Sequence, residues 1–254
     1  MSIVRALFLL VLLLHPKVRA QFGPLMTLTQ TPQAKSAEEL DAYLEIYRNA
    51  NPQSTVAFAN QFAATYPQSE FLALVYEHQT LAYQQMNNYE GVLEAGEKAL
   101  SLSPRNIKVL VTLALVIPNG VTGRSDSSRL LEQSESYARQ ALKELEEKKI
   151  PQDLALGEWL EIKGELESEC HEALGHANLK RGNPTTAVKE FHEAAFGNPK
   201  PNSRQFLRLS SAYLLTGQPD AAEQAAERAV RLGEGQIRQL ALRQLQEIQA
   251  RSRK

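Results

Sequence analysis

The chain of 254 residues has one cysteine, Cys170, and few glycines and prolines, 13 and 12 respectively. A single thiol excludes an intrachain disulfide framework and a metal site built from several thiolates. The low glycine and proline content excludes collagen-like and long disordered chains. The net charge of −1 gives no dominant basic surface, so no nucleic-acid partner is expected. The sequence also lacks a phosphate loop, a dinucleotide fingerprint and a nucleophile elbow, so neither a cofactor nor an enzymatic activity is expected.

An apolar run begins close to the N-terminus. Met1–Arg5 carries a positive charge, residues 6–14 are all apolar, and Val18-Arg19-Ala20 offers small residues for cleavage. This order predicts a secretory signal peptide over residues 1–20. Nine apolar residues span about 14 Å as a helix, against about 30 Å of hydrocarbon, so no stable membrane span is expected after cleavage.

Cleavage after Ala20 has consequences for the rest of the chain. It removes three basic residues and no acid, which changes the net charge from −1 to −4. We expect an exported protein, periplasmic or extracellular, in which residues 21–35 form a linker.

Three later stretches resemble one another: Tyr89–Pro104, Asn183–Pro199 and Gln218–Leu232. Each places small residues at matching positions, and Ala194 and Ala229 are 35 residues apart. The segment before each stretch has apolar or small residues at i, i+3, i+4 and i+7, which predicts a helix with one apolar face. Small residues at facing positions let two antiparallel helices approach closely, so the sequence predicts repeated helix pairs.

The unit 168–199 has Leu174, Gly175, Ala187, Phe191, Ala194 and Pro199 in the order that resembles the tetratricopeptide repeat. It departs from the family at Asn178, where tyrosine is favoured. The unit 203–234 lacks the closing proline, and the unit 73–106 has Gly96 where a large residue is usual. The resemblance implies an all-α, right-handed superhelical α-solenoid of about five helix pairs over residues 36–234.

Degenerate units complete this array. Ser36 and Glu39 form a capping-box pattern before a first helix, and Pro52–Thr65 is its expected partner. We expect a helix over 107–117 that stops at Pro118, an insertion over 118–128, and a second helix over 129–148. The next first helix is extended, from 153 to 181. Residues 235–254 are predicted to form a C-terminal capping helix, giving about eleven helices in all.

The segment 170–176 carries most of the candidate chemistry. His171 and His176 are five residues apart, about 140° round a helix, whereas zinc binding on one helix face needs a spacing of four. We therefore expect no metal site, with His171 packed and His176 facing solvent or a groove. Cys170 and Trp159 are expected in the core. A hydrolytic site near His171 and His176, or in the loop 121–128, is the remote alternative.

The resemblance also implies that the first helix of each pair lines a concave surface. The positions it implies are Leu74, Glu77, Leu81, Gln84, Lys108, Val111, Leu115, Glu169, Glu172, His176, Leu179, Arg204, Leu207, Ser211 and Leu214. Aliphatic and charged side chains mixed in this way suit a peptide or a helix of a partner protein. Some of the aliphatic residues could instead pack between neighbouring repeats.

Two functional hypotheses follow from these features. The first is an exported, non-catalytic scaffold that binds a partner protein or peptide through its concave face. The alternative is a structural subunit of an envelope or secretion assembly, which predicts an exposed apolar patch outside the concave face.

Overall fold

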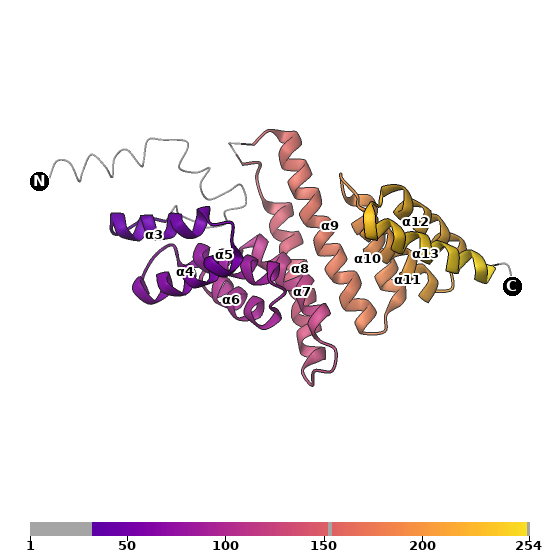
Figure 1. Ribbon diagram of the computed structural model, residues 1–254, viewed down its shortest axis with the longest axis horizontal. Coiled ribbons are helices and arrows are strands. Elements are labelled where there is room, and N and C mark those ends of the chain that lie inside the picture. Colours follow the sequence, from indigo (N-terminus) through magenta and orange to yellow (C-terminus); the bar gives the residue numbers. More distant parts are fainter. Residues whose placement is uncertain (1–31, 152–153, 253–254) are drawn as a thin grey trace, which may run out of the picture.

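The computed structural model describes residues 32–151 and 154–252, and within these ranges the secondary structure is entirely helical. The described residues form eleven helices (Figure 1): α3 (Ala37–Arg48), α4 (Pro52–Thr65), α5 (Leu72–Gln85), α6 (Tyr89–Leu102), α7 (Ile107–Gly120), α8 (Ser127–Glu147), α9 (Leu156–Lys180), α10 (Pro184–Gly197), α11 (Ser203–Leu215), α12 (Pro219–Leu232) and α13 (Gly235–Ser252). The predicted signal peptide lies outside the described residues.

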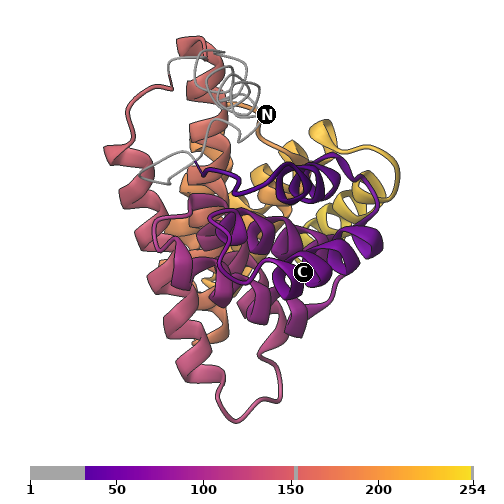
Figure 2. The ribbon, with the colours of Figure 1, turned by 90° about the vertical axis from the view of Figure 1, so that its left-hand side faces the viewer.

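Consecutive helices pack as pairs, from α3 with α4 to α11 with α12, and α13 packs on both α11 and α12. The pairs follow one another along the long axis of the molecule (Figure 1), and α9 extends beyond the N-terminal helices that face the viewer in Figure 2. The prediction of an α-solenoid of five helix pairs and a final helix is confirmed.

The turn that joins the two helices of a pair is the same in three units. Asn87, Gly182 and Gly217 adopt positive φ angles of 53°, 77° and 70°. The amide of the next residue bonds back to a carbonyl five positions earlier, for example from Asn183 N to Asn178 O at 2.9 Å. Glycine adopts this left-handed conformation at no steric cost, and asparagine tolerates it better than most residues.

Small residues let the helices within a pair approach closely. A Cβ atom added at Gly175 on α9 would lie 2.6 Å from Cε1 of Phe191 on α10. Gly96 on α6, which departs from the family pattern, also allows a close contact. The space that its missing side chain leaves is occupied by Leu113 on α7. A glycine at this position therefore preserves the packing by admitting a large residue from the next unit.

The expected helix stop at Pro118 is wrong, because α7 continues through Pro118 to Gly120. Proline has no amide hydrogen, so it cannot donate the helical bond to the carbonyl of Ala114. The hydroxyl of Ser134 on α8 donates to that carbonyl instead, at 2.8 Å. The loop between α7 and α8 is correspondingly shorter than the predicted insertion.

The remaining helix bounds lie close to the expected ones. Pro52–Thr65 is a helix as predicted, and Ser36 caps α3 by accepting from the amide of Glu39 at 3.1 Å. The Glu39 side chain accepts from the amide of Lys35. The extended helix α9 begins at Leu156, and residue 153 lies outside the described part of the chain.

Cys170 and Trp159 lie in the core between α7, α8 and α9, as predicted. Burial raises the pKa of the Cys170 thiol, which opposes formation of the reactive thiolate. None of the described helices is long and apolar enough to cross a membrane.

Candidate partner-binding groove

The groove consists of two hollows that share four lining residues: Leu115, Glu172, Arg204 and Arg208. The larger hollow, of about 610 Å³, lies among α5, α6, α7, α9 and α11. The smaller hollow, of about 270 Å³, lies between α9, α11 and the segment before α11. The first helices α5, α7 and α9 pack on one another in succession, whereas α9 and α11 do not pack along their lengths. The groove therefore opens where this succession of first helices is interrupted.

Five of the residues predicted to bind a partner line the larger hollow: Gln84, Leu115, Glu172, His176 and Arg204. Glu169 lines the smaller hollow. The structure thus brings together residues from four different helices that the resemblance had placed on one surface.

Three predicted groove residues, Leu74, Val111 and Leu207, are buried in the hydrophobic core. They pack between repeats, which is the alternative that the sequence left open. Leu179 is likewise partly buried against the core around α10 and α11. Leu81 is half-buried and lines neither hollow.

Glu77 and Lys108 lie away from both hollows and bind each other across the contact between α5 and α7. Lys108 Nζ lies 3.2 Å from Glu77 Oε1, and the amide of the Asn106 side chain donates to Glu77 Oε2 at 2.7 Å. Only 10% of the Glu77 side chain is exposed. These charges therefore support the start of α7, which Asn106 caps.

Ser211 and Leu214 face the final helix. Gln244 on α13 donates to the Ser211 hydroxyl at 3.1 Å, and Leu214 packs with Leu245 and the buried Ile248. The capping helix thus covers the end of the surface that the resemblance assigned to partner binding.

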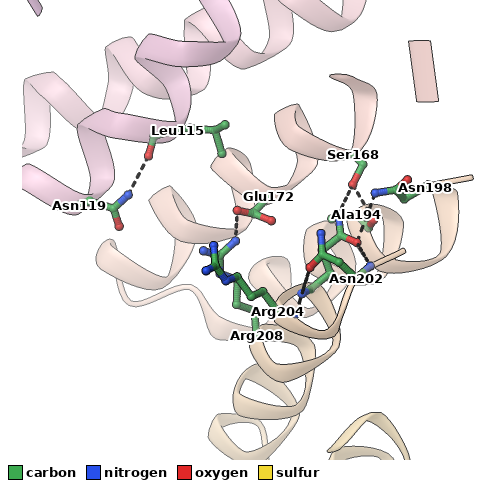
Figure 3. A network of polar contacts seen from close by, with 10 residues as sticks. Leu115, Asn119, Ser168, Glu172, Ala194, Asn198, Asn202, Arg204 and Arg208 are labelled. Atoms are coloured by element: carbon green, nitrogen blue, oxygen red, sulfur yellow. Dashed lines mark hydrogen bonds and ion pairs between the residues drawn. The ribbon is translucent and has the colours of Figure 1, made fainter. Parts of the chain in front are cut away.

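An ion pair between Arg208 on α11 and Glu172 on α9 bridges the groove (Figure 3). Burial lowers the pKa of Arg208. Arg204, one turn earlier on α11, and Leu115 on α7 line both hollows together with this ion pair. The central part of the groove therefore combines an aliphatic side chain with a fixed charge pair.

Polar atoms at the wall of the larger hollow lack partners. The Tyr89 hydroxyl and His176 Nε2 are buried atoms without a hydrogen bond among the described residues. The His176 ring meets Phe191 edge-on, with 5.2 Å between ring centroids, and burial lowers its pKa. The neutral imidazole that this favours can donate or accept one hydrogen bond at Nε2, depending on its tautomer.

The two histidines of the segment 171–176 do not share a site. His171 Nδ1 lies 2.8 Å from Glu190 Oε2 on α10, and His171 lines neither hollow. Within the described ranges, no group of three or more His, Cys, Asp or Glu residues is placed to hold a metal ion.

The charged residues of the loop after α7 are ion-paired. Arg124 Nε lies 3.0 Å from Asp126 Oδ1, and Arg124 Nη1 lies 2.6 Å from Glu90 Oε1. These ion pairs connect the loop to the start of α6 and to the residue before α8.

Several groove residues were missed by the sequence analysis, notably Arg208, Glu165 and Tyr89. The first two could have been found by helical spacing, because Arg208 follows Arg204 by four residues and Glu165 precedes Glu169 by four. Tyr89 gives no such signal, because it reaches the groove from the start of a second helix.

Comparison with known proteins supports the fold independently. The family model described as tetratricopeptide repeat matches residues 206–232. TTC0263, a thermophilic tetratricopeptide-repeat protein of Thermus thermophilus, is similar in structure, with a TM-score of 0.55, 14% identity, and coverage of 82% of this chain and 97% of that one. PilW, a widely conserved type IV pilus biogenesis factor, has a TM-score of 0.55 and 15% identity, with 85% of this chain and 92% of PilW covered.

No curated protein sequence matches this chain. The tetratricopeptide-repeat family consists of helical scaffolds that typically bind proteins and are generally non-catalytic. The chain is therefore an all-helical array of packed helix pairs whose fold is similar to that of tetratricopeptide-repeat proteins, and the family model matches it at residues 206–232.

Proposed function

We propose that the chain is an exported, non-catalytic scaffold that binds a segment of a partner protein in the groove. The observation that carries this proposal is the continuity of the two hollows through Leu115, Glu172, Arg204 and Arg208. Polar and charged side chains form most of the lining, and Leu115 supplies an aliphatic contact in both hollows, so hydrogen bonds and ion pairs would orient a bound segment.

An affinity pull-down with two charge-reversal variants tests the groove. Arg204 is exposed and lines both hollows, so Arg204→Glu changes the charge of the groove without removing a core contact. Arg139→Glu makes the same change at an exposed position of α8 that lines neither hollow. We expect Arg204→Glu to lose partners that the wild type and Arg139→Glu both retain. Equal recovery by all three proteins would count against the groove.

Export is proposed from the N-terminal sequence. The three-part pattern of residues 1–20 predicts cleavage before Gln21. N-terminal sequencing of the protein from its native cells should give Gln21 as the first residue. A chain that keeps Met1 in the cytoplasmic fraction would contradict this proposal.

An exposed apolar surface favours a second candidate, a structural role in an envelope or secretion assembly. Leu156 and Leu160, one turn apart at the start of α9, are 57% and 52% exposed. We call this pair the α9 tip. If permanent assembly contacts are made there, Leu156→Ser with Leu160→Ser should abolish partner recovery, whereas Arg204→Glu should leave it intact.

A further inference from the structure

The smaller hollow separates acidic and basic side chains onto facing walls. Glu165, Glu169 and Glu172 occur at spacings of four and three on α9, which places them on one helix face. The other wall carries Lys200 before α11, and Arg204 and Arg208 on it. A ligand in this hollow therefore meets charges of both signs.

Most of the basic groups already have partners. Lys200 Nζ lies 2.6 Å from Glu161 Oε2, and Arg208 pairs with Glu172. Glu165, Glu169 and Arg204 form no ion pair within 4.0 Å of another described residue. The lining carries three acidic and three basic side chains, but Lys200 is paired with Glu161, which lies outside the hollow. The carboxylates of Glu165 and Glu169 and the guanidinium of Arg204 therefore remain without an ion pair within the described part of the chain.

Glu169 is exposed at the hollow, and its neighbours still affect its titration. Partial desolvation by the surrounding protein raises the pKa of its carboxyl group, and the negative charge of Glu165 raises it further. A cation close to a carboxylate acts in the opposite direction, because it favours the charged form. The Glu165–Glu169 pair is therefore an environment in which an additional positive charge is stabilising.

We propose that the smaller hollow receives a lysine or arginine side chain of the bound partner segment, which the carboxylates of Glu165 and Glu169 hold. This inference rests on the proposed function, because it names the chemistry of the partner in the same groove. Leu115, shared by both hollows, contacts the aliphatic stem of that side chain, since lysine and arginine bury their methylene groups along apolar surface. A partner carboxylate would be repelled by the same two glutamates.

Selection from a displayed library of random peptides tests the proposal, with the full chain immobilised. We compare the wild type with the double variant Glu165→Gln and Glu169→Gln, which keeps the shape and removes both charges. Arg139→Gln, at the exposed position of α8 that lines neither hollow, is the control. Circular dichroism shows whether all three proteins keep the same helical content.

We expect peptides selected on the wild type and on Arg139→Gln to be enriched in lysine and arginine, and those selected on the double variant to lose the enrichment. A peptide selected on the wild type should bind the double variant at least tenfold more weakly. Its affinity for the wild type should also fall on acidification, and the fall should begin above the pH at which an ordinary glutamate, with a pKa of about 4.3, is protonated, because the pKa of Glu169 is raised.

Two results would overturn the proposal, and they are distinguishable. Selected peptides without basic enrichment, or enrichment that survives in the double variant, would reject the basic partner and leave the groove function in place. Failure of the wild type to retain any peptide above background would reject both the groove function and this inference.

Discussion

Arg208 on α11 and Glu172 on α9 are ion-paired across two helices that do not pack along their lengths. Only 16% of the Glu172 side chain and 33% of the Arg208 side chain are exposed. Gln205, one turn before Arg208, adds a second bridge by donating from Nε2 to the Ser168 hydroxyl at 2.6 Å. Side chains rather than helix packing therefore set the separation of these groove walls.

This arrangement predicts a measurable coupling between Arg208 and Glu172. Exposed ion pairs contribute up to about 1 kcal/mol, and burial of one partner increases the cost of leaving it unpaired. We expect a coupling free energy above about 1 kcal/mol in a double-mutant cycle of Arg208→Met and Glu172→Gln, measured by urea unfolding. Additive effects of the two substitutions would show that the bridge does not hold the walls together.

Ser168 and Ser203, which are 35 residues apart, make equivalent buried hydrogen bonds. We expect their replacement by alanine to lower the free energy of unfolding by unequal amounts. Ser168 donates to the carbonyl of Ala194, and Ser203 donates to that of Ala229, both at 2.7 Å. Ser168 also accepts from Gln205, so its removal leaves a second buried group without a partner. An unsatisfied buried group costs about 1–3 kcal/mol, so Ser168→Ala should destabilise the chain more than Ser203→Ala in urea unfolding. The reverse order would contradict the role given to Gln205.

Replacing each of two glycines on α9 by alanine should change the thermal stability of the chain in opposite directions. At Gly175 the added Cβ would lie 2.6 Å from Phe191, whereas at Gly157 nothing lies within 4 Å. Overpacking costs about 1–3 kcal/mol, and alanine in an open helical position gains up to about 1 kcal/mol over glycine. Gly175→Ala should therefore lower the thermal midpoint and Gly157→Ala should raise it. A stabilising Gly175→Ala would show that the two helices can separate at little cost.

Acidification should destabilise the chain through His78. Burial lowers the pKa of His78, with Lys108 acting in the same direction and Glu77 opposing it. The rings of Tyr43 and Tyr47 also face it. Below about pH 6.5 the unfolded histidine binds a proton that the folded one does not, so stability falls as the pH decreases.

Urea unfolding between about pH 7 and about pH 5 measures this dependence. The variant His78→Gln cannot titrate and should lose less stability over that range than the wild type. The comparison at about pH 8, where both proteins carry a neutral side chain at this position, gives the cost of the substitution itself. An equal loss in both proteins on acidification would exclude His78 as a source.

Helix pairing could be predicted from the sequence because it is encoded by local spacing. Ala187 and Ala194 on α10 are buried at the intervals that the pattern required. The continuation of α7 through Pro118 could not be predicted, because its lost hydrogen bond is replaced by Ser134, twenty positions from the carbonyl of Ala114. A partner so distant leaves no local signal.

The groove was predictable only in part, for a related reason. Helical position placed Leu115 and Leu207 on equivalent faces, but Leu115 lines both hollows and Leu207 is buried. The difference depends on which neighbouring helix covers each face. Packing between units decides this, and the periodicity of a single helix does not report it.

The most direct test of the central claim is the position at which the chain contacts its partner in native cells. A photo-crosslinking amino acid would be placed singly at Asn119 or Arg204 in the groove, at Leu160 on the α9 tip, and at Arg139 as an exposed control. The groove account predicts a discrete partner adduct from Asn119 and Arg204 and none from Arg139. Adducts from Leu160 alone, with none from either groove position, would contradict it.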